Sequence, residues 1–338
     1  MASRGIFDAT VVANVSLCRE HYKLTLHIPG LPESAPGQFV QVNCRNPHAG
    51  EVDHEVEWAP GQRPTIVGAE FDHHEAFLRR PFSIAGRRGD DIDLIGREVG
   101  PGTRFLAHLK AGDAVSVVGP LGNRFELPGP NGIALLVGGG VGIPPMIYVA
   151  QAIEALNAAN PNDRPRRAVA FAGALTKDLM ALTVTDDHAP SPLHQTTEPQ
   201  NHSTVHPVYN VAEFRAFNVP AILTTDDGTL GMKGFVTVAL EQYLDAYLTD
   251  NADRNRAILY TCGPEGMMKA IQQIAARRGI RCQIAVERAM ACGMGTCQSC
   301  CIKVKKPDPS KPPLEGKDWC YRLACTDGPV FEGTTLLW

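Results

Sequence analysis

Four cysteines near the end of the chain have the types and spacing of an iron-sulfur site. Cys292, Cys297 and Cys300 are separated by four and then two residues, and Cys325 follows from a separate segment. This is the C-x4-C-x2-C…C spacing that holds a 2Fe-2S cluster. Two irons bridged by sulfides need thiolates that converge from different directions, and a sharply turning loop can supply three of them. We therefore interpret these cysteines as cluster ligands.

Two glycines help this loop to surround a cluster, and a further cysteine nearby is an alternative fourth ligand. Gly293 and Gly295 allow the positive φ of a tight loop and let backbone N–H groups approach the sulfurs. Two cysteines are candidates for the fourth ligand. Cys325 precedes a Thr-Asp-Gly-Pro turn and is preferred, whereas Cys320 is the alternative. A disulfide or a zinc site is less favoured, because zinc sites usually contain two Cys-x-x-Cys or Cys/His pairs.

Length, composition and charge restrict the class of protein. The chain of 338 residues has room for two to three domains, and its 44% hydrophobic and 20% charged residues are typical of globular protein. A net charge of -4 provides no basic field for nucleic acid or for an anionic membrane. The sequence has no apolar run of transmembrane length and no signal-peptide pattern, so we expect a soluble, cytoplasmic protein. Ten cysteines in that compartment indicate metal binding rather than disulfides.

The first part of the chain has the pattern of a small antiparallel β-barrel. Runs with period two or with β-branched residues at 23–28, 38–42 and 114–118 predict strands, and Pro/Gly turns separate them. Two segments of this part could bind a nucleotide cofactor. The stretch 79–84 offers guanidinium groups and a hydroxyl on one strand, and the glycine turn 96–103 leads into a short helical pattern whose first amides favour phosphate.

From about residue 131 the pattern changes to alternating β and α elements. The run 133–137 predicts a buried parallel strand, and Gly-Gly-Gly-Val-Gly-Ile-Pro-Pro at 138–145 turns into a helix. This alternation predicts a doubly wound parallel sheet that binds ligands at the carboxyl ends of its strands. Further predicted strands cover 168–172, 221–225, 257–262 and 283–286, and predicted helices cover 146–156, 236–247 and 265–278.

The turns that follow these strands carry candidate nucleotide-binding residues. The glycine turn does not fit G-x-G-x-x-G, because Ile143 stands where the third glycine would fall. Asp226 and Asp227 end one strand with carboxylates that suit ribose hydroxyls and repel a 2′-phosphate. Cys262 and Gly263 end another strand, where a small thiol and a close-approach glycine suit a nicotinamide ring. Each has a structural alternative. The glycine turn can serve only as a tight strand-to-helix turn, Asp226 and Asp227 as a solvated turn, and Cys262 as a core cysteine.

Two polar segments interrupt these patterns. We interpret 46–71 as a surface loop or insertion, and 183–207 as a second insertion. The second contains His188, His194, His202 and His206, which lack helical i, i+4 spacing and have no cysteine nearby. Exposed loop histidines are therefore favoured over metal ligands.

The order of these motifs resembles the ferredoxin-NADP reductase superfamily. The barrel, the glycine turn, Asp-Asp-Gly-Thr-Leu-Gly, Cys-Gly-Pro-Glu-Gly-Met-Met and the cysteine loop all follow in sequence. Met290-Ala291-Cys292-Gly293 and the stretch 325–331 resemble the electron-transfer subunits of type B dihydroorotate dehydrogenase. The resemblance covers nearly the whole chain except the two insertions and a long gap between Cys300 and Cys325. It implies an FAD-binding β-barrel domain at 1–130, an NAD-binding α/β domain at 131–282 and a 2Fe-2S domain at 283–338.

The resemblance also implies roles for individual residues. Arg80 would contact the FAD pyrophosphate, Ser83 would lie near the flavin N5, and Cys262 would lie beside nicotinamide and flavin. The implied FAD-binding residues are Arg80, Pro81, Phe82, Ser83, Gly102 and Thr103. The implied NAD-binding residues are Gly138, Gly139, Gly140, Gly142, Asp226, Asp227, Gly263 and Pro264. The implied cluster ligands are Cys292, Cys297, Cys300 and Cys325.

The activity that the resemblance implies is electron transfer in pyrimidine biosynthesis. Electrons would pass from the FMN of a separate dihydroorotate dehydrogenase catalytic subunit, through the 2Fe-2S cluster and FAD of this chain, to NAD+. The two kinds of subunit would form a heterotetramer, with neither nucleic acid nor membrane as partner. FAD suits the middle position, because nicotinamides exchange electron pairs and iron-sulfur clusters exchange single electrons. The alternative is a stand-alone NAD(P)H:acceptor reductase that serves an oxygenase or another redox partner, and a non-enzymatic sensor is disfavoured.

Overall fold

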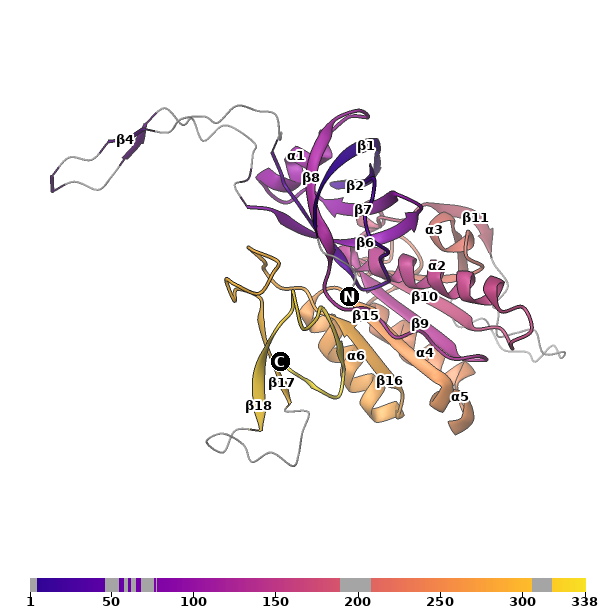
Figure 1. Ribbon diagram of the computed structural model, residues 1–338. Coiled ribbons are helices and arrows are strands. Elements are labelled where there is room, and N and C mark those ends of the chain that lie inside the picture. Colours follow the sequence, from indigo (N-terminus) through magenta and orange to yellow (C-terminus); the bar gives the residue numbers. More distant parts are fainter. Residues whose placement is uncertain are drawn as a thin grey trace.

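The computed structural model describes residues 5–45, 55–57, 60–61, 65–67, 76, 78–188, 208–305 and 318–338. Within these ranges the chain forms a β-barrel, an α/β unit and a smaller C-terminal β unit, which lies beside the last strands of the α/β unit (Figure 1). These three parts confirm the predicted fold class. No helix in the described ranges is long and apolar enough to cross a membrane.

The barrel closes in the strand order β1-β2-β7-β6-β3-β8. Closure leaves no unpaired strand edge. Its interior is built by alternate apolar residues, among them Leu24, Leu26 and Ile84, which are almost completely buried. Helix α1 (Pro101–Ala107) packs against β2 and β7. The barrel strands are β1 (Gly5–Cys18), β2 (His21–His27), β3 (Phe39–Val42), β6 (Arg80–Arg88), β7 (Asp91–Arg97) and β8 (Ala114–Leu121).

The α/β unit contains a parallel sheet in the order β13-β10-β9-β15-β16. Its strands are β9 (Ile133–Gly139), β10 (Arg167–Ala174), β13 (Ala221–Thr225), β15 (Ala257–Cys262) and β16 (Arg281–Ala285). The main helices are α2 (Ile143–Ala159), α4 (Val236–Tyr247) and α6 (Glu265–Arg278), with the shorter α3 (Ala212–Arg215) and α5 (Asn251–Arg256) and the 3-10 turns η1 (Gly140–Gly142) and η2 (Lys177–Leu179) between them.

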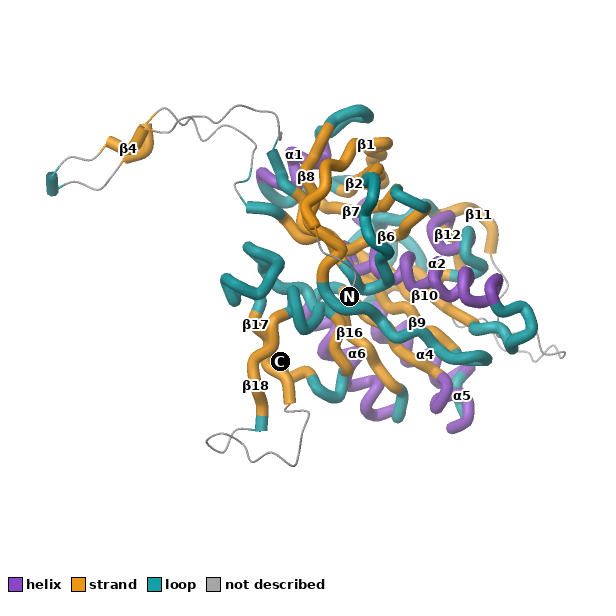
Figure 2. The backbone as a smooth tube through the Cα atoms, in the orientation of Figure 1, coloured by secondary structure: helices purple, strands orange, loops and turns teal. Residues whose placement is uncertain are grey.

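Helices cover both faces of this sheet, so its strands are apolar on both sides. Leu135 and Val137 of β9 pack with α4 and α6, whereas Ala134 and Leu136 pack with α2. Figure 2 shows α2 on one side of the strands and α4 and α6 on the other. Because α2 also packs against β6, the barrel is held beside the carboxyl ends of the parallel strands.

Antiparallel strands extend the sheet at both edges. On one edge, β12 (Val208–Val211) pairs antiparallel with β13, and β11 (Val184–His188) pairs antiparallel with β12. The short β14 (Met232–Lys233) pairs parallel with β13, off the main path. The segment interpreted as the second insertion therefore begins with a strand. Residues 189–207, which include His194, His202 and His206, lie outside the described residues. In the first insertion the described part is a two-stranded pair, β4 (Glu55–Glu57) and β5 (Thr65–Val67).

On the other edge, the C-terminal part of the chain completes the sheet. β19 (Val330–Glu332) pairs antiparallel with β16. The remaining strands β17 (Cys301–Lys305), β18 (Trp319–Leu323) and β20 (Leu336–Leu337) form a separate sheet in the order β18-β17-β20. The boundary expected after residue 282 falls inside β16, because the parallel sheet continues to Ala285.

Candidate functional site

A groove of about 780 Å3 lies where the barrel, the parallel sheet and the cysteine loop, residues 291–300, meet. One wall comes from β6 and the start of α1, a second from η1 and the ends of β15 and β16, and a third from the cysteine loop. Its size lies within the range of small-molecule sites. The predicted residues in its lining are Arg80, Pro81, Phe82, Ser83, Thr103, Gly142 and Cys262, and the cysteine loop contributes Ala291 and Ser299.

Neighbouring arginines on this wall have different roles. Arg79 is tied to β8, because its guanidinium donates to the carbonyl oxygen of Ser116 at 2.7 Å and to the Ser116 hydroxyl at 2.9 Å. Arg80 lines the groove, and its Nη1 donates to the carbonyl oxygen of Leu78 at 2.8 Å. Of these two neighbours, Arg80 is therefore the one whose guanidinium can meet an anionic ligand in the groove.

The glycine turn before α1 is organised by Thr103. Its hydroxyl oxygen accepts the backbone N–H groups of Val99 at 2.9 Å and Gly100 at 3.1 Å. These bonds hold the turn at the start of a helix against the groove. Gly102 does not line the groove. A Cβ at that position would lie 3.2 Å from the Sγ of Cys44, so packing against the barrel accounts for this glycine.

A second cavity, of about 650 Å3, opens at the carboxyl ends of β9, β10, β13 and β15. This is the edge where parallel α/β sheets bind ligands. Asp226 lines it, but Asp227 does not. The Asp227 carboxylate accepts the Thr229 N–H at 3.0 Å and the Thr229 hydroxyl at 2.7 Å, and these bonds lower the pKa of Asp227. The other predicted residues that line this cavity are Gly139, Gly140 and Pro264.

Two glycines at the junction of the groove and the cavity are required by close approach. A Cβ on Gly142 would lie 2.1 Å from the carbonyl oxygen of Cys262, so any larger residue would separate the glycine turn from β15. Gly263 has φ +144, and a Cβ there would lie 2.7 Å from the methyl group of Met267. Gly138 and Gly263 line neither space. Cys262 is 8% exposed, and burial raises the pKa of its thiol to about 12, so it forms a neutral wall of the groove.

The cysteine loop directs backbone N–H groups at a sulfur. The Sγ of Cys292 accepts the N–H groups of Met294 and Cys297, both at 3.4 Å. The Sγ of Cys297 lies 3.1 Å from the Ser299 hydroxyl, and hydrogen bonds from Ser299 lower the pKa of Cys297 to about 6. Gly293 and Gly295 have φ +70 and +90, as the tight-loop interpretation requires.

The structure places Cys325, rather than Cys320, beside this loop. Cys300 and Cys325 are each 1% exposed, and the Ala324 N–H donates to the Cys300 carbonyl oxygen at 3.1 Å. Burial and the adjacent Cys300 raise the pKa of Cys325 to about 12. Cys320 stands opposite Val304 within the β17–β18 pair, before the turn that leads to Cys325. The described residues contain no group of three or more His, Cys, Asp or Glu side chains placed to hold a single metal ion.

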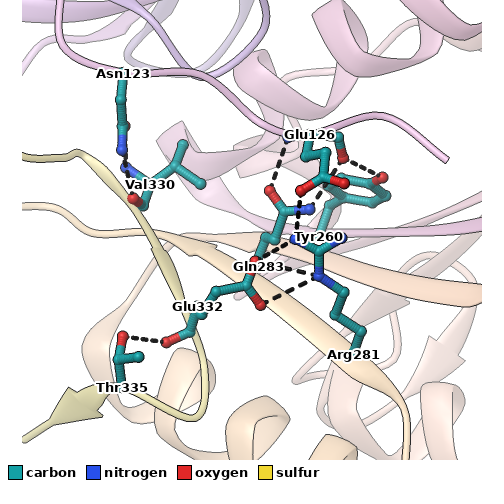
Figure 3. Close-up of polar contacts among 8 residues, drawn as sticks. All are labelled: Asn123, Glu126, Tyr260, Arg281, Gln283, Val330, Glu332 and Thr335. Carbon is teal, nitrogen blue, oxygen red and sulfur yellow. Dashed lines mark hydrogen bonds and ion pairs between the residues drawn. The ribbon is translucent and has the colours of Figure 1, made fainter. Parts of the chain in front are cut away.

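The segment after Cys325 is fastened to the linker that leaves the barrel. The Val330 N–H donates to the Asn123 Oδ1 at 2.9 Å, and the Asn123 Nδ2 donates to the Val330 carbonyl oxygen at 2.8 Å (Figure 3). The Asn123 Nδ2 also donates to the Asp327 carbonyl oxygen at 3.1 Å. We call Asn123 and residues 327–330 the C-terminal clamp. It fixes the Cys325 segment relative to the groove, because Pro329 is part of the groove wall.

A network of polar contacts continues the attachment along β16. Arg281 pairs with Glu126 and with Glu332, both at 2.6 Å (Figure 3). The Glu126 backbone is held as well, because its N–H donates to the Gln283 Oε1 at 2.9 Å and its carbonyl oxygen accepts the Tyr260 hydroxyl at 2.8 Å. The linker, β15, β16 and β19 are thus bound together at one place.

Three residues that sequence reasoning missed also face these spaces. Arg97 lines both the groove and the cavity, and His21 and Phe235 line the cavity. Burial lowers the pKa of His21, so its imidazole is neutral at pH 7. Arg97 lies inside the glycine turn 96–103, which was a usable signal. The sequence contains no comparable signal for His21 or Phe235, because barrel folding is what brings His21 to the sheet.

The residues present fit the groups that the motifs imply. A groove with a guanidinium and a helix start suits a dinucleotide flavin, and a carboxylate at a sheet edge suits ribose hydroxyls. Four thiols, one of which accepts two backbone N–H groups, suit an iron-sulfur cluster. This combination of fold and site defines a flavin- and nicotinamide-linked oxidoreductase with an iron-sulfur domain.

Comparisons with known proteins agree with this class. The family model described as the iron-sulfur cluster binding domain of dihydroorotate dehydrogenase B matches residues 287–337. The chain is 30% identical over 333 residues to a Fusobacterium nucleatum subsp. nucleatum protein named dihydroorotate dehydrogenase B (NAD(+)), electron transfer subunit, with 96% of each chain covered. A protein of the same name from Caldanaerobacter subterraneus subsp. tengcongensis is 27% identical over 329 residues, with 97% of each covered. The chain belongs to the family of dihydroorotate dehydrogenase B electron transfer subunits.

Solved structures show the same fold at lower sequence identity. An NADH-dependent reduced ferredoxin-NADP oxidoreductase aligns with a TM-score of 0.65 at 24% identity, covering 98% of this chain and 90% of that chain. An Amycolatopsis cytochrome P450 reductase aligns with a TM-score of 0.51 at 20% identity, covering 82% of this chain and 67% of that chain.

Proposed function

We propose that this chain carries electrons from the FMN of a dihydroorotate dehydrogenase catalytic subunit, through its 2Fe-2S cluster and FAD, to NAD+. The observation that carries the proposal is the groove, because β6, the end of β15 and the cysteine loop line the same space. When bound there, FAD supplies exchange of electron pairs with a nicotinamide and of single electrons with an iron-sulfur cluster. Family membership supports the identity of the electron donor.

On the barrel side, the proposed role of the chain is to hold and orient FAD. We assign Arg80 to the pyrophosphate, because its guanidinium lines the groove whereas Arg79 is engaged with Ser116. Ser83 also lines the groove and would offer its hydroxyl to the flavin ring system, and Pro81 and Phe82 form the adjoining wall. Thr103 acts by holding the turn, and Gly102 acts by packing.

On the sheet side, the proposed role is to bind NAD(H) in the second cavity. We assign Asp226 to the ribose hydroxyls, and Gly139, Gly140 and Pro264 to close contact with the dinucleotide. Asp227 acts indirectly by holding Thr229. Gly138, Gly142 and Gly263 allow the glycine turn and β15 to approach each other. The neutral thiol of Cys262 would meet the flavin and nicotinamide rings without placing a charge against them.

We assign Cys292, Cys297, Cys300 and Cys325 as the ligands of the cluster. The position of Cys325 next to Cys300 supports it over Cys320. The loop is also outward-facing, because Cys297 is exposed and Met294 between the ligands is 59% exposed. We propose that the catalytic subunit docks on this loop, because the exposed loop carries three of the assigned ligands. A heterotetramer in the cytoplasm is the assembly that we propose, in keeping with the family.

Coexpression with a dihydroorotate dehydrogenase catalytic subunit tests the function. The expected result is a stable complex that reduces NAD+ on addition of dihydroorotate, while neither subunit alone does so. Iron, sulfide and flavin analysis of the purified chain provides the control for cofactor content. A fully loaded chain that oxidises NADH with artificial acceptors, yet forms no complex and gives no dihydroorotate-dependent activity, would contradict the assignment and favour a stand-alone reductase.

A further inference from the structure

Gln41 is a buried polar residue whose side chain has no partner among the described residues. It is 0% exposed, and neither its Oε1 nor its Nε2 makes a hydrogen bond. A buried amide without hydrogen-bond partners destabilises the folded chain, because it has lost its water and gained nothing in exchange. Native proteins rarely keep such a group without a reason, and an unplaced ligand is one of the known reasons.

The position of Gln41 directs its amide away from the barrel interior. It lies on β3 between Pro81 of β6 and Val118 of β8. Its neighbours Val40 and Val42 are part of the barrel core, and strand alternation places Gln41 on the opposite face. Phe39, on the same face as Gln41, packs in the cluster of buried residues that contains Cys300 and Cys325.

The Gln41 side chain, on the outer face of β3, reaches the cysteine loop. A Cβ on Gly293 would lie 2.8 Å from both the Cγ and the Nε2 of Gln41. The loop therefore passes directly over the Gln41 amide, at a residue where a side chain would displace it. Gly293 follows Cys292, whose Sγ already accepts two backbone N–H groups. The Gln41 amide therefore lies against the residue that follows Cys292 in the chain, a ligand whose sulfur already accepts two hydrogen bonds.

The flavin is a less suitable partner for this amide. The groove is lined by Phe39, Pro81 and Phe82, which surround Gln41 in the sheet, but Gln41 itself is not part of the lining. An amide N–H donor suits an anionic sulfur, and outer hydrogen bonds of this kind tune iron-sulfur clusters. Hydrogen bonds to the sulfurs stabilise the more negative, reduced cluster and so raise its reduction potential.

We propose that the Gln41 side-chain amide donates a hydrogen bond to an anionic sulfur on the Cys292 side of the cluster. Gln41 is then a positioning residue that couples the barrel to the cluster and raises the cluster's reduction potential. The proposal rests on the proposed function in requiring that the cluster be present. It adds a contact from a strand of the flavin-binding barrel, distant in sequence from the ligands.

The test is an EPR-monitored redox titration of the full chain loaded with FAD and cluster. Gln41→Leu and Gln41→Met remove the N–H donor and keep the bulk, and Met retains the unbranched shape if Leu packs poorly. We expect the ratio of reduced to oxidised cluster at a fixed potential to fall by up to about tenfold, which equals about 59 mV for one electron. An unchanged midpoint potential in both variants, with normal iron and sulfide content, would overturn the role of Gln41. Absence of iron and sulfide from the wild-type chain would instead refute the cluster assignment.

A second readout separates this role from ordinary packing. Because Gln41 has no partner in the described protein, its replacement by Leu should leave the thermal stability of the cluster-free full chain unchanged or higher. Gln283→Leu is the matched control, since Gln283 is 2% exposed and its amide binds the Glu126 backbone at 2.9 and 3.0 Å. That variant should lose stability and keep the wild-type cluster potential. Lower stability of the cluster-free Gln41→Leu chain without a change in potential would refute the proposal.

Discussion

Asn123 connects the linker that leaves the barrel to the segment that carries Cys325, so Asn123→Ala should loosen that segment selectively. The side chain makes three hydrogen bonds, at 2.9 and 2.8 Å with the Val330 backbone and at 3.1 Å with the Asp327 carbonyl oxygen. The substitution removes all of them and leaves the β19 pairing with β16 in place.

The expected magnitude follows from these three contacts. A hydrogen bond contributes about 1 kcal/mol net, so the three bonds of the Asn123 side chain contribute about 3 kcal/mol against local opening. Val330 is 6% exposed, so water does not readily replace the lost partner. Since 1.4 kcal/mol is a factor of ten, hydrogen exchange at the Val330 amide should accelerate on the order of 100-fold when it proceeds by local opening.

Hydrogen-exchange mass spectrometry of peptides that cover 325–332 measures this change in the loaded chain. Stopped-flow reduction by NADH is the second readout. We expect unchanged flavin reduction and slower cluster reduction, because the clamp positions the cluster segment against the groove. Asn157→Ala is the control, since the Asn157 amide binds the Arg166 backbone at 2.9 and 3.0 Å, at the far end of α2. Exchange that stays at the wild-type rate across 325–332, or rises equally in the control, would refute this account of the clamp.

Three further predictions concern the fourth cluster ligand, the binding of NADH and the titration of a buried thiol. Cys325→Ser should abolish the visible absorbance of the cluster whereas Cys320→Ser should retain it, and the reverse pattern would exchange their roles. Asp226→Asn should raise the KM for NADH by about tenfold or more with little change in kcat, as loss of a charge-assisted hydrogen bond predicts; Asp227→Asn, whose side chain holds Thr229, should have a smaller effect. Burial raises the pKa of Cys282 from 9.0 to about 12. The folded chain therefore keeps a proton that the unfolded chain loses, and the unfolding free energy should fall by about 1.4 kcal/mol per unit above pH 9 from this thiol. Urea denaturation of Cys282→Ala should show a correspondingly shallower alkaline decline.

Much of the fold was predictable because its signals are local. The helices at 236–247 and 265–278 and the strands at 221–225 and 257–262 have the bounds that their apolar patterns indicate. Strands buried on both faces read as continuous apolar runs, and helices begin at defined turns. The antiparallel additions β11 and β19 were not predicted, because short strands at sheet edges depend on a partner that is distant in sequence.

The sequence predicted which residues belong to the site better than it predicted what each residue contacts. The sequence pattern selected Asp226 and Asp227 together, but only the fold shows that one faces the cavity and the other holds Thr229. The glycines were selected as close-approach residues. For Gly142 the approaching group is the carbonyl oxygen of Cys262, within the protein itself. The contact between Gln41 and Gly293 had no local signal, because it joins a barrel strand to the cysteine loop.

Because β19 pairs with β16, the C-terminal part of the chain protects one edge of the parallel sheet. Within the described ranges, β16 is an edge of the parallel sheet, and β19 is the strand that shields it. An uncovered edge strand presents unpaired backbone groups to other chains. The turn from Cys325 leads directly into β19, so damage that releases this turn also weakens the cover. If oxidative loss of the cluster released β19, the chain would expose the edge of β16 and would then tend to self-associate.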